Sequence, residues 1–142
     1  MATQRRADVV WEGNLLEGSG TVVSNTSGAL PQLPVSWPSR AEEPAGKTSP
    51  EELIAAAHAA CFAMALSHEL AEGGHTAERL ETSATVTFQP GEGIQGSELT
   101  VRGTVPGLSE EAFLQAAESA KDNCPVSQAL SVPITLDATF AG

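Results

Sequence analysis

The sequence predicts a single α+β domain spanning residues 1–142, in which two helices lie on an antiparallel sheet. Segments rich in β-branched residues stand before and after one long alanine-rich stretch, and a second helical pattern precedes the last such segment. The order is therefore strands, long helix, strands, helix, strand. A chain of 142 residues is long enough to bury a hydrophobic core without disulfides or metals.

Five segments have the composition of strands. The turn pair Gly13-Asn14 closes a first hairpin, and Pro90-Gly91 joins a second, antiparallel pair. The residues between position 25 and position 48 contain four prolines and predict a loop or an edge strand, because proline cannot donate to a ladder. The predicted strands are residues 7–16, 20–24, 81–88, 95–105 and 132–140.

The long helix has a clear start and a clear stop. Ser49 is the predicted N-cap, Pro50 fits the first helical position, and Glu51 and Glu52 complement the positive end of the helix dipole. Glu52 also has the spacing of a capping box with Ser49. The helix should end at Gly73-Gly74. Its middle is apolar all round, which predicts a central helix buried by other elements on every side.

A second, amphipathic helix is expected over residues 109–121, with Ser109 as its cap. Pro125 then restarts a short helix over residues 125–130. Cys124 stands immediately before this proline, which places its side chain at the start of the short helix.

Charge and hydropathy exclude several classes of partner. The net charge of −11 argues against binding to nucleic acid or to an anionic membrane surface. The apolar stretch runs only from Leu53 to Leu66, short of the roughly 20 residues of a membrane-spanning helix. No apolar run follows the first arginines, so we expect no secretory signal and a cytoplasmic protein. In that reducing compartment a disulfide is usually catalytic or transient.

The two cysteines lie in different chemical environments. Cys61 stands among alanines in the long helix, whereas Cys124 heads the Cys-Pro-Val-Ser run. The pair is compatible with a dithiol that cycles between reduced and oxidised forms. It is equally compatible with two inert thiols, because free cysteine is among the most buried residue types.

Two segments resemble a known family. Thr48–Leu66, with Cys61 near its centre, and Cys124–Leu130 are similar to the corresponding motifs of the OsmC/Ohr family, and within it to the osmotically inducible OsmC branch. The resemblance implies an obligate, intertwined homodimer with active sites at the subunit interface. It implies that Cys61 attacks peroxide, that Cys124 resolves the product into a disulfide, and that Arg40 and Glu51 position and activate the thiolate.

The same resemblance implies an activity. The protein would be a thiol-dependent peroxidase that reduces organic hydroperoxides, and hydrogen peroxide less well, in defence against oxidative or osmotic stress. A dithiol reductant, such as a dihydrolipoyl group, would restore both thiols. No cofactor is implied.

The chemistry of the residues adds independent constraints. Burial among alanines disfavours the thiolate of Cys61, and the dipole at the start of its helix fades within a turn, so a reactive Cys61 needs a nearby cation. Arg40 is the best candidate, and Glu51 would hold it by a forked ion pair. Without the resemblance, Arg40 would be taken for a solvated loop charge and Glu51 for a complement to the helix dipole.

The spacing on the helix points to a second copy of the chain. Ten residues of helix rise roughly 15 Å, so Glu51 and Cys61 of one helix cannot share a site directly. Local chemistry alone favours Cys124 as the reactive thiol, because thiolates are stabilised at helix N-termini. The assignment of Cys61 as the attacking thiol rests on the resemblance.

Other candidates are weaker. His58, Cys61 and His68 do not supply the four converging ligands of a closed zinc site, so we expect no metal. His58 fits a core histidine better than a base, and Phe62 fits either the core or the wall of an apolar substrate pocket. Two rival functions remain at this stage: a stress or small-molecule-binding protein without peroxidase activity, and a structural dimer with inert cysteines.

Overall fold

The computed structural model describes all residues, Met1–Gly142, and divides them into two compact units, residues 1–53 and 54–142. The predicted helices and strands follow one another in the expected order, with one additional short helix before the long one, so the α+β class is confirmed. The single domain over residues 1–142 stays a prediction. The boundary between the units falls within the long helix, and each unit is described by itself.

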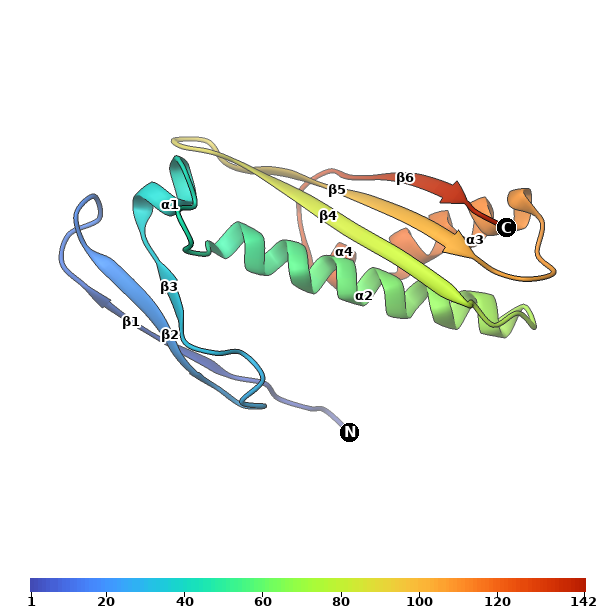
Figure 1. Cartoon of the computed structure of the whole chain (residues 1–142), viewed down its shortest axis with the longest axis horizontal. Coiled ribbons are helices and arrows are strands. Elements are labelled where there is room, and N and C mark those ends of the chain that lie inside the picture. The colour runs from blue at the N-terminus through green and yellow to red at the C-terminus, as the bar shows by residue number, and fades with distance from the viewer. The chain divides into compact units, whose positions relative to one another are not determined.

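The N-terminal unit is built on a three-stranded antiparallel sheet in the order β1-β2-β3 (Figure 1). Gly20 in β2 allows a close approach, because a Cβ there would lie 2.7 Å from the ring of Trp11. The edge strand β3 contains Pro34, as expected for a proline in a sheet. The strands are β1 (Ala7–Glu12), β2 (Ser19–Asn25) and β3 (Leu33–Val35).

A short helix, α1 (Trp37–Ala41), follows β3 in the region predicted to be irregular. Its start is a capping box, in which the Ser36 hydroxyl accepts from the backbone N–H of Ser39 and the Ser39 hydroxyl accepts from that of Ser36. Serine at the N3 position of such a box is a weaker signal than glutamate. Together with the surrounding prolines, this explains why the sequence did not predict the helix. Arg40 lies in its last turn.

The long helix, α2 (Pro50–Glu72), begins and ends where the sequence predicts. The Ser49 hydroxyl accepts a hydrogen bond of 3.2 Å from the backbone N–H of Glu52. The carboxylate of Glu52 accepts a hydrogen bond from the Thr48 hydroxyl, so the side-chain partner of Glu52 at the start of the helix is Thr48. Gly74 has a φ of 86°, a conformation in which glycine readily ends a helix.

The C-terminal unit carries a second three-stranded sheet, β4-β5-β6 (Figure 1). Its β4 and β5 pair antiparallel as predicted, but β5 and β6 are parallel, so the expectation of a wholly antiparallel sheet was wrong. Parallel neighbours need a long crossover, and the two helices between β5 and β6 supply it. The elements are β4 (Arg79–Gln89), β5 (Gly93–Thr104), α3 (Glu110–Asn123), α4 (Pro125–Ala129) and β6 (Ile134–Phe140).

The core of this unit lies between one face of the sheet and the helices α2 and α3. Phe62 and Leu66 of α2 meet Leu99 and Val101 of β5 there, and Phe113 of α3 completes the cluster. All five side chains are buried. The opposite sheet face is polar and exposed, as the alternating burial of β4 and β5 shows.

The single chain does not surround α2 as its composition suggested. Ala56, Ala60 and Met64 are exposed on the helix, and Met64 keeps 73% of its surface accessible. By length and composition alone α2 would be able to cross a membrane, a test that the core helix of a soluble protein also passes. The intertwined dimer, which would cover this face, stays a prediction.

Candidate active site

The C-terminal unit brings Cys61 and Cys124 together. Cys61 projects from the middle of α2 and is partly exposed, whereas Cys124 is fully buried between the end of α3 and the start of α4. Both are free thiols, and they lie close enough for each to shift the pKa of the other. The predicted N-cap position of Cys124 is confirmed.

The surroundings of the two thiols push their pKa values apart. Burial opposes ionisation of Cys124, but hydrogen bonds from Cys61, from the backbone N–H and hydroxyl of Ser127 and from the backbone N–H of Val126 outweigh it and lower its pKa. Burial raises the pKa of Cys61, and the hydrogen bond to Cys124 raises it further, while a bond from Val126 acts in the other direction. In a single chain Cys124 is therefore the more readily ionised thiol.

His58 stands on α2 about one turn before Cys61. It is fully buried on α2, and its Nδ1 and Nε2 atoms lie 2.7 Å from the hydroxyl oxygens of Ser97 and Ser127, respectively. Burial lowers the pKa of His58, so the imidazole is neutral near pH 7. His58 is thus a core histidine with both nitrogens satisfied, as expected.

Sequence reasoning did not find the two serines. Ser127 is part of the Cys-Pro-Val-Ser run, and a hydroxyl one helical turn beyond a helix-capping cysteine was an available signal. Ser97 lies on β5, far from His58 in the sequence, and nothing local marks it.

Arg40 and Glu51 form a forked ion pair in the N-terminal unit. Arg40 Nη2 donates to Glu51 Oε2 at 2.7 Å, and Nε lies 3.0 Å from Oε1 and 3.1 Å from Oε2. The Glu51 side chain is only 7% exposed and that of Arg40 30%. The expected contact between these two residues is present. Their role toward Cys61 stays a prediction.

The apolar residues near Cys61 are arranged differently from the expectation. Phe62 is completely buried in the core, so it lines no open pocket in the single chain. Ala57, Ala60 and Met64 share the exposed face of α2 with Cys61. The partly exposed thiol therefore stands on a small-residue, apolar surface.

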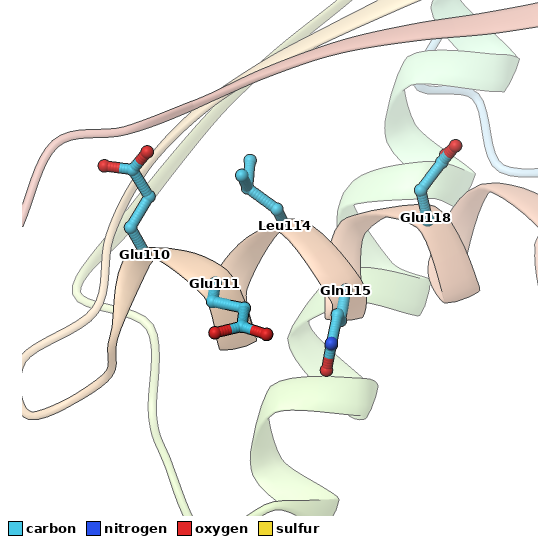
Figure 2. A pocket seen from close by; sticks show the side chains of 5 residues that line it. All are labelled: Glu110, Glu111, Leu114, Gln115 and Glu118. Carbon is cyan, nitrogen blue, oxygen red and sulfur yellow. The ribbon is translucent and has the colours of Figure 1, made fainter.

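A hollow of about 680 Å³ lies on α3 and contains no thiol. Figure 2 shows Glu110, Leu114 and Glu118 on one side of the helix, with Glu111 and Gln115 on another. This surface carries three carboxylates and offers neither a thiol nor a cation, so it is not the site of thiol chemistry. No group of three or more His, Cys, Asp or Glu side chains is arranged to hold a metal ion.

Comparison with known proteins points to one family. The sequence profile described as OsmC-like protein matches residues 43–138. The chain is 43% identical over 140 residues to the peroxiredoxin OsmC of Escherichia coli, and the alignment covers 96% of each protein. The peroxiredoxin OsmC of Shigella flexneri matches equally well.

Solved structures have the same fold. The organic hydroperoxide resistance protein OhrB of Bacillus subtilis is 25% identical, with a TM-score of 0.65 over 95% of this chain and 97% of that one. An OsmC-like protein from Mycoplasma pneumoniae gives a TM-score of 0.74 over 100% of both chains, and at 17% identity it supports the fold alone.

Proposed function

The chain belongs to the OsmC-like protein family, and from this premise we propose that it is a cysteine-based peroxidase that reduces organic hydroperoxides. The observation that carries the proposal is the pair of neighbouring free thiols, Cys61 and Cys124, one partly exposed and the other buried. The relationship to the peroxiredoxin OsmC of Escherichia coli over nearly the whole chain supports a peroxide-reducing oxidoreductase.

The proposed reaction begins at Cys61, the thiol that is accessible from solvent. Its thiolate attacks the terminal oxygen of the hydroperoxide, the O–O bond breaks, and the alkoxide leaves as an alcohol after taking up a proton. Cys61 is then a sulfenic acid. The thiolate of Cys124 attacks this sulfur, hydroxide leaves as water after protonation, and a Cys61–Cys124 disulfide forms. A dithiol such as a dihydrolipoyl group is oxidised as it restores both thiols.

Ionisation of Cys61 requires a stabilising charge, and Cys124 does not supply it. Burial and the neighbouring Cys124 raise the pKa of Cys61, so a cation is needed to favour its thiolate. We assign this role to Arg40, oriented by Glu51, from a second copy of the chain. The helical rise of roughly 15 Å between Glu51 and Cys61 supports a shared site in a homodimer. The exposed small-residue face of α2 supports it as well.

Substrate preference follows from the surface around Cys61. Ala57, Ala60 and Met64 offer apolar contact and no hydrogen bonds, which suits an organic hydroperoxide better than hydrogen peroxide. The cycle needs a compartment in which a dithiol reductant is maintained, and we propose the cytoplasm.

The proposal is tested with fully reduced protein mixed separately with cumene hydroperoxide and hydrogen peroxide, while thiol loss is followed over time. We expect faster loss with cumene hydroperoxide. Cys61→Ser should abolish the reaction, whereas Cys124→Ser should still be oxidised but form no intramolecular disulfide.

Three outcomes would contradict parts of this scheme. No thiol loss with either peroxide would favour a binding protein without peroxidase activity. Equal or faster second-order rates with hydrogen peroxide would contradict the substrate preference inferred from the apolar surface around Cys61. A sulfenic acid trapped on Cys124 in an active Cys61→Ser protein would reverse the two roles.

A further inference from the structure

A chain of polar contacts leads from the sheet to the buried thiol. Ser97 on β5 has its hydroxyl 2.7 Å from His58 Nδ1, and the Ser127 hydroxyl lies 2.7 Å from His58 Nε2. Ser127 stands one helical turn beyond Cys124, and its hydroxyl acts on the Cys124 thiol to lower its pKa. Ser97 and His58 are 1% and 0% exposed, so no solvent competes for the contact between them, whereas Ser127 is half-buried. These contacts connect β5, α2 and α4 through Ser97, His58 and Ser127.

The number of hydrogens on the three side chains determines which group donates at each contact. Ser97, neutral His58 and Ser127 each contribute one hydrogen to three contacts. A thiolate at Cys124 only accepts, so Ser127 must then donate to sulfur and in turn accept from Nε2–H. Nδ1 is left to accept from Ser97. The charge on Cys124 thereby requires the Nε2–H tautomer of His58.

The opposite state reverses each bond. If Cys124 is a thiol that donates to Ser127, the Ser127 hydroxyl turns to Nε2, and His58 carries its hydrogen on Nδ1 toward Ser97. The imidazole stays neutral in both states, which agrees with the effect of burial on its pKa. His58 therefore does not act as a base that accepts the proton of the thiol.

We propose that His58 is a positioning residue that acts through Ser127: its Nε2–H holds the Ser127 hydroxyl so that the hydroxyl proton points at Cys124 and stabilises the thiolate. Polarised chains of this kind strengthen their terminal bond in a low-dielectric interior. Cys61 is the titratable group that bonds directly to Cys124, and His58 is the one that reaches it through Ser127.

The consequence for the reaction rests on the proposed peroxidase cycle. When a dithiol reduces the Cys61–Cys124 disulfide, its thiolate attacks Cys61, the S–S bond breaks, and the electron pair leaves on Cys124. The second thiol of the reductant then displaces Cys61. A stabilised Cys124 thiolate is the better leaving group. The contacts from Ser97 through His58 to Ser127 therefore favour attack at Cys61 and speed the reductive half of the cycle.

The experiment titrates Cys124 alone, in a Cys61→Ser background, by its ultraviolet thiolate absorbance. Ser127→Ala should raise the pKa of Cys124 by about one to two units, because a hydrogen bond to a charged group contributes about 1.5–3 kcal/mol and 1.36 kcal/mol equals one unit. His58→Leu should raise it by a smaller amount, about half a unit. Ser119→Ala, which removes an α3 hydroxyl that donates to Glu69 of α2, is the matched control and should leave the titration unchanged.

His58→Gln separates a directed bond from simple packing, because the glutamine amide can donate from nearly the position of Nε2. This variant should restore most of the lowered pKa that His58→Leu loses. In a Ser127→Ala background the difference between the two His58 variants should vanish. Nitrogen NMR shifts of His58 should show the Nε2–H tautomer when Cys124 is ionised and the Nδ1–H tautomer when it is not.

Two results would overturn the inference: an unchanged titration in folded Ser127→Ala protein, or an effect of His58→Leu that persists undiminished without Ser127. If His58→Leu fails to fold, the serine variant and His58→Gln still decide. The titration needs no peroxide, so its result stands even if the protein proves inactive. In disulfide-containing protein, Ser127→Ala should also slow reduction by dithiothreitol.

Discussion

The Arg40–Glu51 ion pair allows a quantitative prediction, because its two halves differ in burial. Glu51 is 7% exposed and Arg40 30%, and the pair is joined at three donor–acceptor distances between 2.7 and 3.1 Å. Two substitutions of similar size remove one charge each, Arg40→Met and Glu51→Gln. We expect them to destabilise the protein unequally.

The magnitudes follow from what each variant leaves behind. Arg40→Met leaves an almost fully buried carboxylate, and breaking a buried pair in this way costs about 3–5 kcal/mol. The partial exposure of Arg40 means that water already screens the pair, so we reduce the expected loss of unfolding free energy to about 2 kcal/mol. Glu51→Gln leaves a guanidinium that can turn to solvent and should cost about 1 kcal/mol.

The assay is urea denaturation followed by tryptophan fluorescence, since Trp37 begins the helix that carries Arg40. The Arg40→Met/Glu51→Gln double variant completes a cycle in which other contacts of either residue cancel. We expect a coupling energy of about 1 kcal/mol. A coupling below about 0.3 kcal/mol, with equal effects of the two single variants, would refute the reasoning. Both variants should also slow peroxide-dependent oxidation of Cys61.

Three further predictions concern other parts of the chain. Burial lowers the pKa of His58, so the unfolded chain binds a proton that the native protein does not, and stability should fall as pH drops below about 6.5, by at most about 1.4 kcal/mol per pH unit; urea titrations should show that His58→Gln removes this component, and an unchanged slope would contradict it. Gly103→Ala should destabilise the protein by about 1–3 kcal/mol in the same assay, because the added Cβ would lie 2.4 Å from the buried ring of Phe113; wild-type stability would show that the ring moves freely. Co-refolding Cys61→Ser chains with Glu51→Ala chains should partly restore peroxidase activity, because half the sites of a mixed dimer would keep both side chains; no gain over the separate mutants would rule out a shared site.

Local signals in the sequence were sufficient for most elements. Ser109 and the Ser49-Pro50 pair marked helix starts that the structure shows within a residue, and Pro125 marked the short helix that Cys124 caps. Such signals work because capping and proline geometry involve only residues a few positions apart. The helix α1 escaped detection because its capping box uses two serines among prolines.

Local signals also predicted some features of the candidate site and missed others. The sequence predicted that Cys124 would start a helix, that His58 would lie in the core and that Arg40 would meet Glu51, and each of these contacts or positions is present. It did not predict Ser97, because the partner of a buried histidine on another element is chosen by packing and not by spacing.

By itself, the sequence determined the class of the fold, the places where helices begin and end, the chemistry of two unlike thiols and the resemblance that connects them. Tertiary structure decided the parallel pairing of β5 with β6, the exposure of one face of α2 and the contacts that push the pKa values of Cys61 and Cys124 apart. The physical reason is the separation along the sequence over which each kind of interaction acts. Caps, turns and periodicity act over a few residues, whereas strand order, burial and hydrogen-bond partners depend on which distant segments the collapsed chain brings together.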